Sequence, residues 1–285
     1  MRNPYFCDEP TVISFSGGRT SAFMLHKVLD AHDGVLPDFV KVVFANTGKE
    51  MPQTLEFVED CSNNWNVDIV WLERFLLSEE ESLAKSGKKY SYETKIVNYK
   101  TASRNGEPFE MLIKQNRGIP DPRNRFCTAE LKVKTFKRYL KSIGWKKWVN
   151  TIGIRADEPN RIKESNERFY DNWYPIAEAN HTKHDILDFW KRQTFDLKVT
   201  SGFGNCDGCF LKSEKSIATL WKLHPERAEW WMSFEEMKHG KKGNKRTFYK
   251  NRTYKEIGDF VSRQGDWIFD TEGVLCQADD VECTG

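Results

Sequence analysis

The sequence predicts an α/β fold: a doubly wound, mostly parallel sheet with a long insertion and a mostly helical C-terminal section. Apolar strand-like segments alternate with amphipathic helix-like segments through the first half of the chain. The most polar and glycine-rich motifs come directly after strand-like segments, where parallel sheets bind ligands. The region after Phe195 is less regular and rich in tryptophan, and we expect it to be mostly helical.

The elements follow from apolar periodicity. We expect strands at Thr11–Phe15, Val40–Ala45, Val67–Leu72 and Trp148–Ile154, and helices at Ser21–Leu29, Gln53–Trp65 and Lys132–Ile143. Residues 74–126 are polar and interrupt this rhythm, so we interpret them as an insertion that could form a lid or a substrate-facing arm. We place the α/β domain at residues 1–200 and a cysteine-containing section at residues 201–285.

Composition limits the class of protein. The 285 residues carry a net charge of +2, with 13% aromatic and 39% hydrophobic residues, as in globular proteins. Basic residues concentrate in Lys132–Lys147 and Lys238–Arg252, near aromatic side chains. Each segment fits either a solvated helix face or a groove for phosphates or nucleic acid. No signal peptide and no apolar run of about 18 residues is visible, which predicts a cytoplasmic protein without a membrane partner.

The most informative motif follows the first expected strand. Thr11–Phe15 ends at a glycine-rich turn, Ser16-Gly17-Gly18, and a helix pattern begins at once. Strand, glycine turn and helix direct backbone N–H groups and a helix N-terminus at an anion. The spacing is neither that of the Walker A loop nor that of the dinucleotide fingerprint. The candidate phosphate-binding residues are Ser14, Ser16, Gly17, Gly18, Arg19, Thr20 and Ser21; the alternative is an ordinary turn between a strand and a helix.

Two further polar clusters follow strands. Asn46, Thr47 and Gly48 come after the second strand and suit a ribose or base edge, or a plain turn that caps the next helix. Arg155 and Arg161 flank two carboxylates after the fourth strand. Arginine forks bind phosphate or sulfate, so this cluster fits an anion clamp, or alternatively a salt-bridged turn.

Seven cysteines in a cytosolic chain favour thiols, metal ligands or catalytic groups over disulfides. Cys206 and Cys209 have the C-x-x-C spacing that lets two thiolates reach one metal or cluster. Cys127 lies upstream, and Cys276 and Cys283 lie near the C-terminus. These residues can supply a four-ligand site for either iron–sulfur or zinc, which the spacing does not distinguish.

These blocks resemble the phosphoadenosine phosphosulfate (PAPS) reductase family of the PP-loop, or adenine nucleotide α-hydrolase-like, superfamily. The motifs that carry the resemblance are S-F-S-G-G-R-T-S from Ser14, N-T-G-x-E-x-P-x-T from Asn46, R-F-C-T-x-x-L-K from Arg125, G-I-R-x-D-E-x-x-R from Gly153 and C-D-G-C-F-L-K from Cys206. The stretch Thr182–Leu197 resembles the family's helix before the second cysteine pair. The first motif is similar to that of uncharacterised phage and bacterial members. Thr20 stands where the usual motif has an acidic residue, and Cys127 stands alone where APS reductases have a cysteine pair.

The resemblance implies an adenine nucleotide, ATP or PAPS/APS, with its phosphates on Ser16–Ser21, with Asn46–Gly48 nearby and with magnesium as a further candidate. Arg155 and Arg161 would hold the second anion. Cys127, Cys206, Cys209 and Cys283 would bind a [4Fe-4S] cluster, with zinc as the alternative metal and Cys276 as the alternative fourth ligand.

Three functions remain open. The first is activation of an acceptor by adenylation followed by sulfur transfer, with a nucleic acid as one candidate acceptor and a separate sulfur donor. The second is reduction of APS or PAPS, with Cys283 as the nucleophile and a thioredoxin-like reductant. The third is a non-catalytic nucleotide-binding module with a structural zinc.

Overall fold

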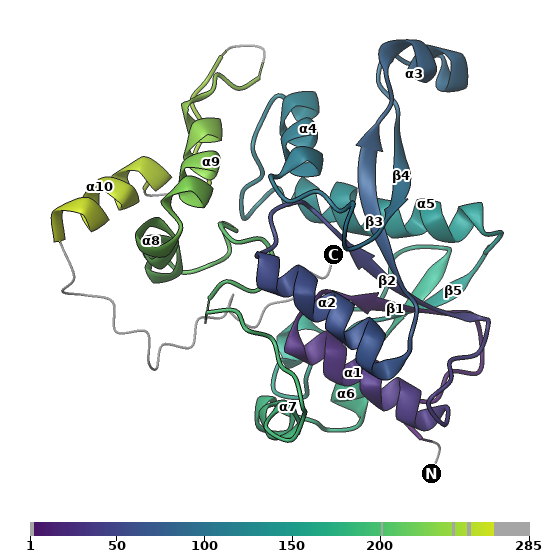
Figure 1. The fold of residues 1–285 in the computed structure, drawn as a ribbon. Helices are drawn as coiled ribbons and strands as arrows, with labels where there is room; N and C mark the ends of the chain where they lie inside the picture. Colours follow the sequence, from purple (N-terminus) through teal and green to yellow (C-terminus); the bar gives the residue numbers. More distant parts are fainter. Residues whose placement is uncertain (1–2, 201, 241–242, 250–251, 265–285) are drawn as a thin grey trace.

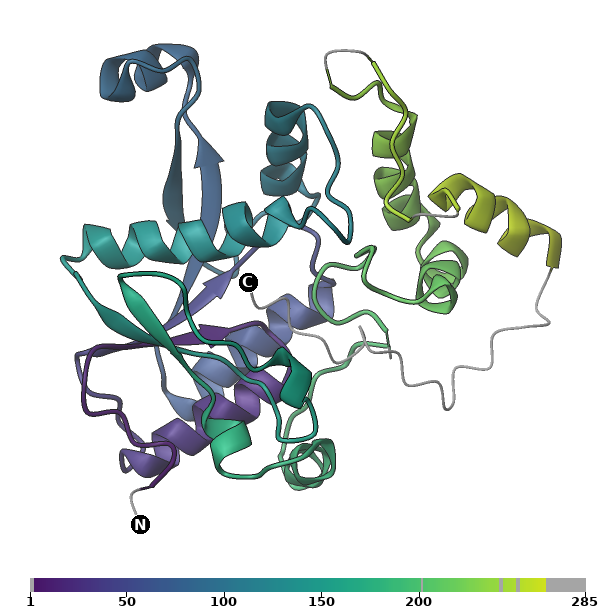
Figure 2. The ribbon, with the colours of Figure 1, turned by 180° about the vertical axis from the view of Figure 1, so that it is seen from behind.

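The computed structural model describes residues 3–200, 202–240, 243–249 and 252–264. A six-stranded sheet lies at its centre, in the order β4-β3-β2-β1-β5-β6 (Figures 1 and 2). The strands are β1 (Thr11–Phe15), β2 (Val40–Ala45), β3 (Ile69–Leu76), β4 (Tyr92–Val97), β5 (Trp148–Thr151) and β6 (Tyr170–Trp173). All neighbours pair in parallel except β3 and β4, which are antiparallel. The predicted mostly parallel α/β fold is confirmed.

Helices cover both faces of the sheet, because side chains of alternate strand residues point to opposite sides. On one face, Ile13 and Phe15 pack with α1 (Arg19–Ala31), α2 (Pro52–Trp65) and α7 (Lys183–Trp190). On the other face, Val12 packs with Leu140 of α5 (Lys134–Ser142). This two-sided cover is the predicted double winding (Figure 1).

The insertion is more regular than predicted. Strand β3 continues to Leu76 and pairs with β4, and this hairpin carries α3 (Glu79–Ser86) away from the sheet (Figure 2). Helix α4 (Glu107–Asn116) follows. The polar composition of these residues reflects an edge strand with one exposed face. The insertion thus contains a strand hairpin and two helices, and its role as a lid or a substrate-facing arm stays a prediction.

Several boundaries also differ from the prediction. The expected strand Trp148–Ile154 ends at Thr151, and β6 was not predicted because Tyr170–Trp173 is short and half polar. A π-helix, η1 (Thr128–Val133), precedes α5, and a short 3-10 helix, η2 (Pro159–Arg161), and α6 (Pro175–Glu178) follow β5 and β6 respectively. The helix expected within Thr182–Leu197 ends at Trp190.

Where the structure describes it, the C-terminal section is mostly helical, as predicted. It contains α8 (Glu214–Leu223), α9 (Pro225–Glu236) and α10 (Tyr254–Gln264). Leu112 of α4 joins Leu220 and Trp231 in one apolar cluster, so part of the insertion packs with this section. The domain boundary near residue 200 stays a prediction. Within the described part of the chain, no helix has the length and apolar character needed to cross a membrane.

Candidate functional site

The turn after β1 is organised by the buried Ser21. Its hydroxyl accepts a hydrogen bond from the Ser16 backbone N–H (3.1 Å), lies 2.9 Å from the Ser16 hydroxyl and donates to the Gly18 carbonyl (3.0 Å). Gly18 is the extended N-cap of α1. Ser21 therefore holds the turn at the positive end of the helix, where an anion is stabilised.

Gly17 is required by its backbone and by its neighbours. Its φ is +81°, a conformation that side chains disfavour. A Cβ there would lie 2.8 Å from Thr54 Cγ2 and 3.2 Å from Val58 Cγ2. The close packing of α2 against the turn thus fixes a glycine here, independently of any ligand.

Arg19 is bound to the protein. Its Nε and Nη2 donate to the two carboxylate oxygens of Asp196 at 2.7 and 2.9 Å, and Nη2 also donates to the Leu197 carbonyl at 2.9 Å. This bidentate pair ties the start of α1 to the segment after α7. Much of the positive charge predicted for a phosphate is already balanced by Asp196.

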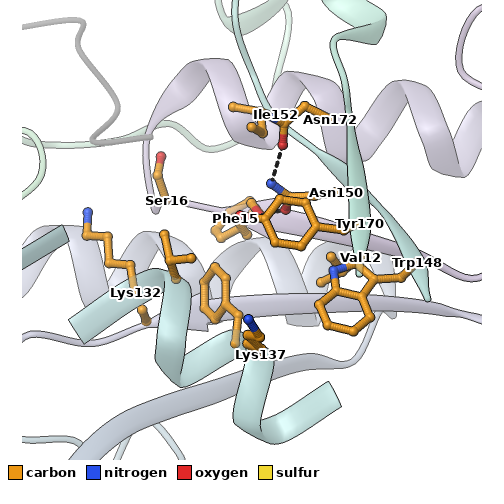
Figure 3. Close-up of a pocket in the computed structure, with 14 residues that line it drawn as sticks. Val12, Phe15, Ser16, Lys132, Lys137, Trp148, Asn150, Ile152, Tyr170 and Asn172 are labelled. Atoms are coloured by element: carbon orange, nitrogen blue, oxygen red, sulfur yellow. Dashed lines mark hydrogen bonds between the residues drawn. The ribbon is translucent and has the colours of Figure 1, made fainter. Parts of the chain in front are cut away.

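A pocket lies between the sheet and the helix η1–α5, and we call it the sheet pocket (Figure 3). Lys132 and Ser16 lie at one end of it, and Trp148 and Tyr170 at the other. The two aromatic rings stack with centroids 5.7 Å apart. The pocket therefore offers an apolar aromatic end and a polar, basic end.

The floor of the sheet pocket carries a chain of polar side chains. The Ser14 hydroxyl donates to Asn150 Oδ1 at 2.7 Å, and Asn150 Nδ2 donates to Asn172 Oδ1 at 3.0 Å (Figure 3). The three residues come from β1, β5 and β6, and each lines the pocket. Ser14 was predicted as a ligand-binding residue, and Asn150 and Asn172 were not.

A second pocket, the anion pocket, lies on the other side of the turn. Its lining includes Ser16, Gly18, Arg19, Thr20, Arg155, Lys183 and Asn205. Arg155 is buried, and its guanidinium donates to Asp157 Oδ1 at 2.9 Å and lies 3.6 Å from Glu158 Oε1. Arg161 pairs with Glu158 and does not line the pocket. The salt-bridged turn is therefore present, and Arg155 lines the pocket beside the glycine turn whereas Arg161 does not, so the anion clamp stays a prediction.

The turn after β2 is hydrogen-bonded within the protein. Fully buried Asn46 donates to Glu73 Oε1 (2.6 Å) and to the Ser103 carbonyl (2.8 Å). Thr47 donates to both carboxylate oxygens of Glu50, through its backbone N–H (3.0 Å) and its hydroxyl (2.8 Å). A Cβ on Gly48 would lie 2.9 Å from the Gly106 nitrogen. Ala45 lines the sheet pocket, whereas Asn46, Thr47 and Gly48 do not.

Three of the predicted cysteine ligands meet in one place. Cys127, Cys206 and Cys209 line a third pocket with Thr47, Lys132 and several apolar side chains, and we call it the thiol pocket. The Thr47 hydroxyl lies 3.3 Å from Cys206 Sγ. Cys276 and Cys283 lie outside the described residues.

The C-x-x-C turn is rigidly held. The buried carboxylate of Asp207 accepts from Trp231 Nε1 at 2.7 Å, pairs with Arg227 and lies 3.5 Å from Lys49 Nζ. Burial lowers the pKa of Lys49. A Cβ on Gly208 would lie 2.3 Å from the Trp231 ring, so only glycine fits between the cysteines.

The cysteines fit a metal only in part. They share a pocket, but among the residues that the structure describes, no three His, Cys, Asp or Glu side chains are close enough together to hold a metal ion. A fourth thiol would have to come from outside those residues.

Two residues connect the three pockets. Ser16 lines both the sheet pocket and the anion pocket, and Lys132 lines both the sheet pocket and the thiol pocket. Lys132 was noted in the sequence only as part of a basic segment. Its importance depends on η1, which turns the side chain at this position toward the end of β1, and π-helices are frequent at functional sites.

Comparison with known proteins identifies the family. The model of the phosphoadenosine phosphosulfate reductase domain matches residues 10–196. The chain belongs to the PAPS reductase family. Members of this family are generally enzymes, and they bind adenine nucleotide substrates. The matched segment includes the glycine turn, Cys127 and Arg155, and ends before the C-x-x-C pair.

Two relatives share much of the chain. The uncharacterised nin region protein ORF290 of Escherichia phage lambda is 34% identical over 213 residues, 74% of this chain and 69% of that protein. An uncharacterised protein of Methanocaldococcus jannaschii is 23% identical over 238 residues, 80% of this chain but 41% of that protein. The likeness to a phage protein agrees with the resemblance noted in the glycine motif.

Two solved structures are similar at a TM-score of 0.38. One is the PAPS reductase of Candida auris in a phosphate complex, which is 16% identical; the match covers 65% of this chain and 72% of that chain. The other is the FMN adenylyltransferase of Candida glabrata in complex with FAD and inorganic pyrophosphate, which is 13% identical; the match covers 72% of this chain and 55% of that chain. The fold of this PAPS reductase family member rests on the strand order of its own sheet, β4-β3-β2-β1-β5-β6.

Proposed function

We propose that this protein is a nucleotide-dependent enzyme that binds ATP, or PAPS or APS, across the sheet pocket and the anion pocket. The observation that supports this most strongly is the position of Ser16, which lines both pockets at the N-terminus of α1. A base and ribose in one pocket would then be continuous with phosphates in the other. Magnesium stays a candidate partner of those phosphates, beside Thr20.

The residues of the two pockets suit the parts of a nucleotide. Trp148, Tyr170 and Phe136 give an aromatic surface for the base, and Asn172 lies among them as a polar group that can meet its edge. The N–H groups of the glycine turn and the N-terminus of α1 face the phosphates. Arg155 and Lys183 add positive charge in the anion pocket.

For ATP, we propose adenylation of an acceptor. An oxygen of the acceptor attacks the α-phosphorus, the bond to the bridging oxygen of the β-phosphate breaks, and pyrophosphate leaves. The turn and Arg155 would stabilise the charge that develops on the phosphates. The outer sulfur of a persulfide, placed by a donor on one thiol of the thiol pocket, would then displace AMP from the acceptor, and a second thiol of that pocket would release the thiolated product by forming a disulfide with the first. Lys132, between the sheet and thiol pockets, would hold the phosphate of the activated acceptor near those thiols.

Reduction of APS or PAPS is the second candidate, because the anion pocket extends beyond the turn to Arg155 and Lys183 and can hold a sulfate. A thiolate, with Cys283 as the candidate, would attack the sulfate sulfur. The sulfur–oxygen bond to the phosphate would break, and the nucleotide would leave an S-sulfo cysteine. A thioredoxin-like dithiol would then release sulfite.

Two assays separate these functions. ATP–pyrophosphate exchange in the presence of acceptor would support adenylation, whereas a gain of one sulfonate on Cys283 after incubation with PAPS, measured by mass spectrometry, would support reduction. Nucleotide binding without either reaction would favour the third function, a non-catalytic nucleotide-binding module with a structural zinc. Absence of nucleotide binding would contradict all three.

The metal is tested separately. Anaerobic purification with iron, sulfide and zinc analysis distinguishes a [4Fe-4S] cluster from zinc. Cys206→Ser should lose the bound metal, because its thiol lines the thiol pocket beside Cys127 and Cys209. Cys61→Ser is the matched control, since this buried cysteine lies in the core of α2. Full retention of metal by Cys206→Ser would contradict the ligand assignment.

A further inference from the structure

Two loops that lie far apart in the sequence form one basic surface. Residues 117–125 follow α4, and residues 237–240 and 243–247 are the described part of the loop that follows α9. The Gly240 N–H donates to the Arg117 carbonyl at 2.6 Å. Arg246 Nη1 lies 3.1 Å from the position of a Cβ on Gly118, so its guanidinium packs against the backbone beside Arg117. We call this surface the paired-loop patch.

The patch carries positive charge without compensation. Its exposed basic residues are Arg117, Arg123, Arg125, Lys238, Lys245 and Arg246. None of them forms an ion pair with any residue that the structure describes. The carboxylate of Asp121 accepts from the backbone N–H groups of Arg123 and Asn124 at 2.7 and 2.9 Å. This acid therefore shapes the loop, and the exposed Glu236 ends α9 directly before Met237 and Lys238.

We propose that the paired-loop patch binds the phosphate backbone of a nucleic acid. Four of the six basic residues are arginines, whose planar fork matches phosphate oxygens. Protein–protein interfaces need an apolar centre, and lysine is depleted there. Met237 is the exposed large apolar side chain of these loops, so the patch is instead polar and positive, as nucleic-acid interfaces are.

The patch continues into the proposed reaction site. Arg125 precedes Phe126 and Cys127, and Phe126 packs with the cluster that contains Cys127 and Cys209. The patch thus ends at Arg125, two residues before Cys127 of the thiol pocket, so a nucleic acid bound to the patch would lie beside that pocket. Its role as the acceptor rests on the proposed function, whereas its binding to the patch does not.

The test is binding of a fluorescein-labelled oligonucleotide, single-stranded and duplex, followed by fluorescence anisotropy over a range of salt concentrations. The variant Arg117→Glu/Arg123→Glu/Arg246→Glu should lose roughly thirtyfold or more in affinity at low salt. When three phosphate contacts are lost, the slope of log affinity against log salt should become shallower by about 2 for the single strand and by about 3 for the duplex. Arg123→Glu alone, on an exposed loop, should give a smaller loss in the same direction.

The matched control is Lys141→Glu/Lys146→Glu/Lys147→Glu. It changes the net charge equally on a different exposed basic segment, at the end of α5 and in the loop that follows it. It should lose less than about threefold, and the melting temperature of each variant confirms folding. Equal loss in both variants, no binding by the unmodified chain, or displacement of the oligonucleotide by polyglutamate as readily as by unlabelled DNA would overturn the proposal. Because this assay needs no ATP or PAPS, its failure is distinct from failure of the nucleotide site.

Discussion

The turns after β1 and β2 occupy equivalent positions and use their polar groups differently. Both end adjacent parallel strands, and both contain a glycine with φ near +80° (Gly17 +81°, Gly48 +79°). After β1, Ser16 and Thr20 line pockets. After β2, Asn46 and Thr47 bind the carboxylates of Glu73 and Glu50. The side chains of Asn46 and Thr47 are thus engaged by protein carboxylates, whereas Ser16 and Thr20 face pockets.

The largest expected effect is that of Gly17→Asp. It should abolish nucleotide binding and lower the free energy of unfolding by at least about 2 kcal/mol, because the backbone is strained and a Cβ meets Thr54. Gly34→Asp is the matched control, since Gly34 has φ +83° with nothing within 4 Å of its Cβ position. It should cost about 1 kcal/mol and leave binding intact. Unchanged nucleotide affinity in Gly17→Asp would remove the basis for assigning the phosphates to this turn.

Arg155→Ala should have the second-largest effect. Calorimetry should show nucleotide binding that is at least about tenfold weaker, which corresponds to about 1.4 kcal/mol. Arg155 lines the anion pocket with the glycine turn, so its loss removes charge from the phosphates. Arg161→Ala should have a smaller effect, since Arg161 pairs with Glu158 away from the pocket. Equal losses of affinity in the two variants would show that Arg155 and Arg161 contribute together through their shared partner Glu158, and would contradict a direct role of Arg155 alone.

Asn46→Ala tests the turn after β2. It should lower the free energy of unfolding by about 2 kcal/mol, because the buried Glu73 loses a donor. Nucleotide affinity of the folded variant should stay within about threefold. The measurements are urea unfolding and calorimetry below the unfolding transition. A stable variant with much weaker nucleotide binding would show that Asn46 contacts the ligand, as the family resemblance implies.

Glu50→Gln should give the smallest effect, and that effect depends on pH. Burial raises the pKa of Glu50 above its usual value of 4.5. A carboxyl with a raised folded pKa favours folding while it is protonated, and this contribution is lost as pH rises through the folded pKa. The free energy of unfolding of the unmodified chain minus that of Glu50→Gln should therefore fall as the pH rises from acid to neutral. A difference that is constant from pH 4 to pH 8 would show that Glu50 titrates normally.

The central strands and the glycine turn could be predicted because their signals are local. Thr11–Phe15 and Val40–Ala45 are short apolar runs bounded by turns, and both matched the structure. β4 and β6 escaped prediction because edge strands are half polar. The residues of the sheet pocket were harder to predict. Asn150, Tyr170 and Lys132 come together because β5 pairs with β6 and because the π-helix η1 places Lys132 at the same pocket. The shared pocket of Cys127, Cys206 and Cys209 was anticipated from the family's cysteine pattern.

The most direct test of the account is a crystal structure with a non-hydrolysable ATP analogue. The account predicts the base against Phe136, Trp148 and Tyr170, and the phosphates on the backbone N–H groups from Gly17 to Ser21, with Arg155 toward the terminal phosphate. A nucleotide bound instead at Asn46–Gly48, or in the thiol pocket, would contradict the account.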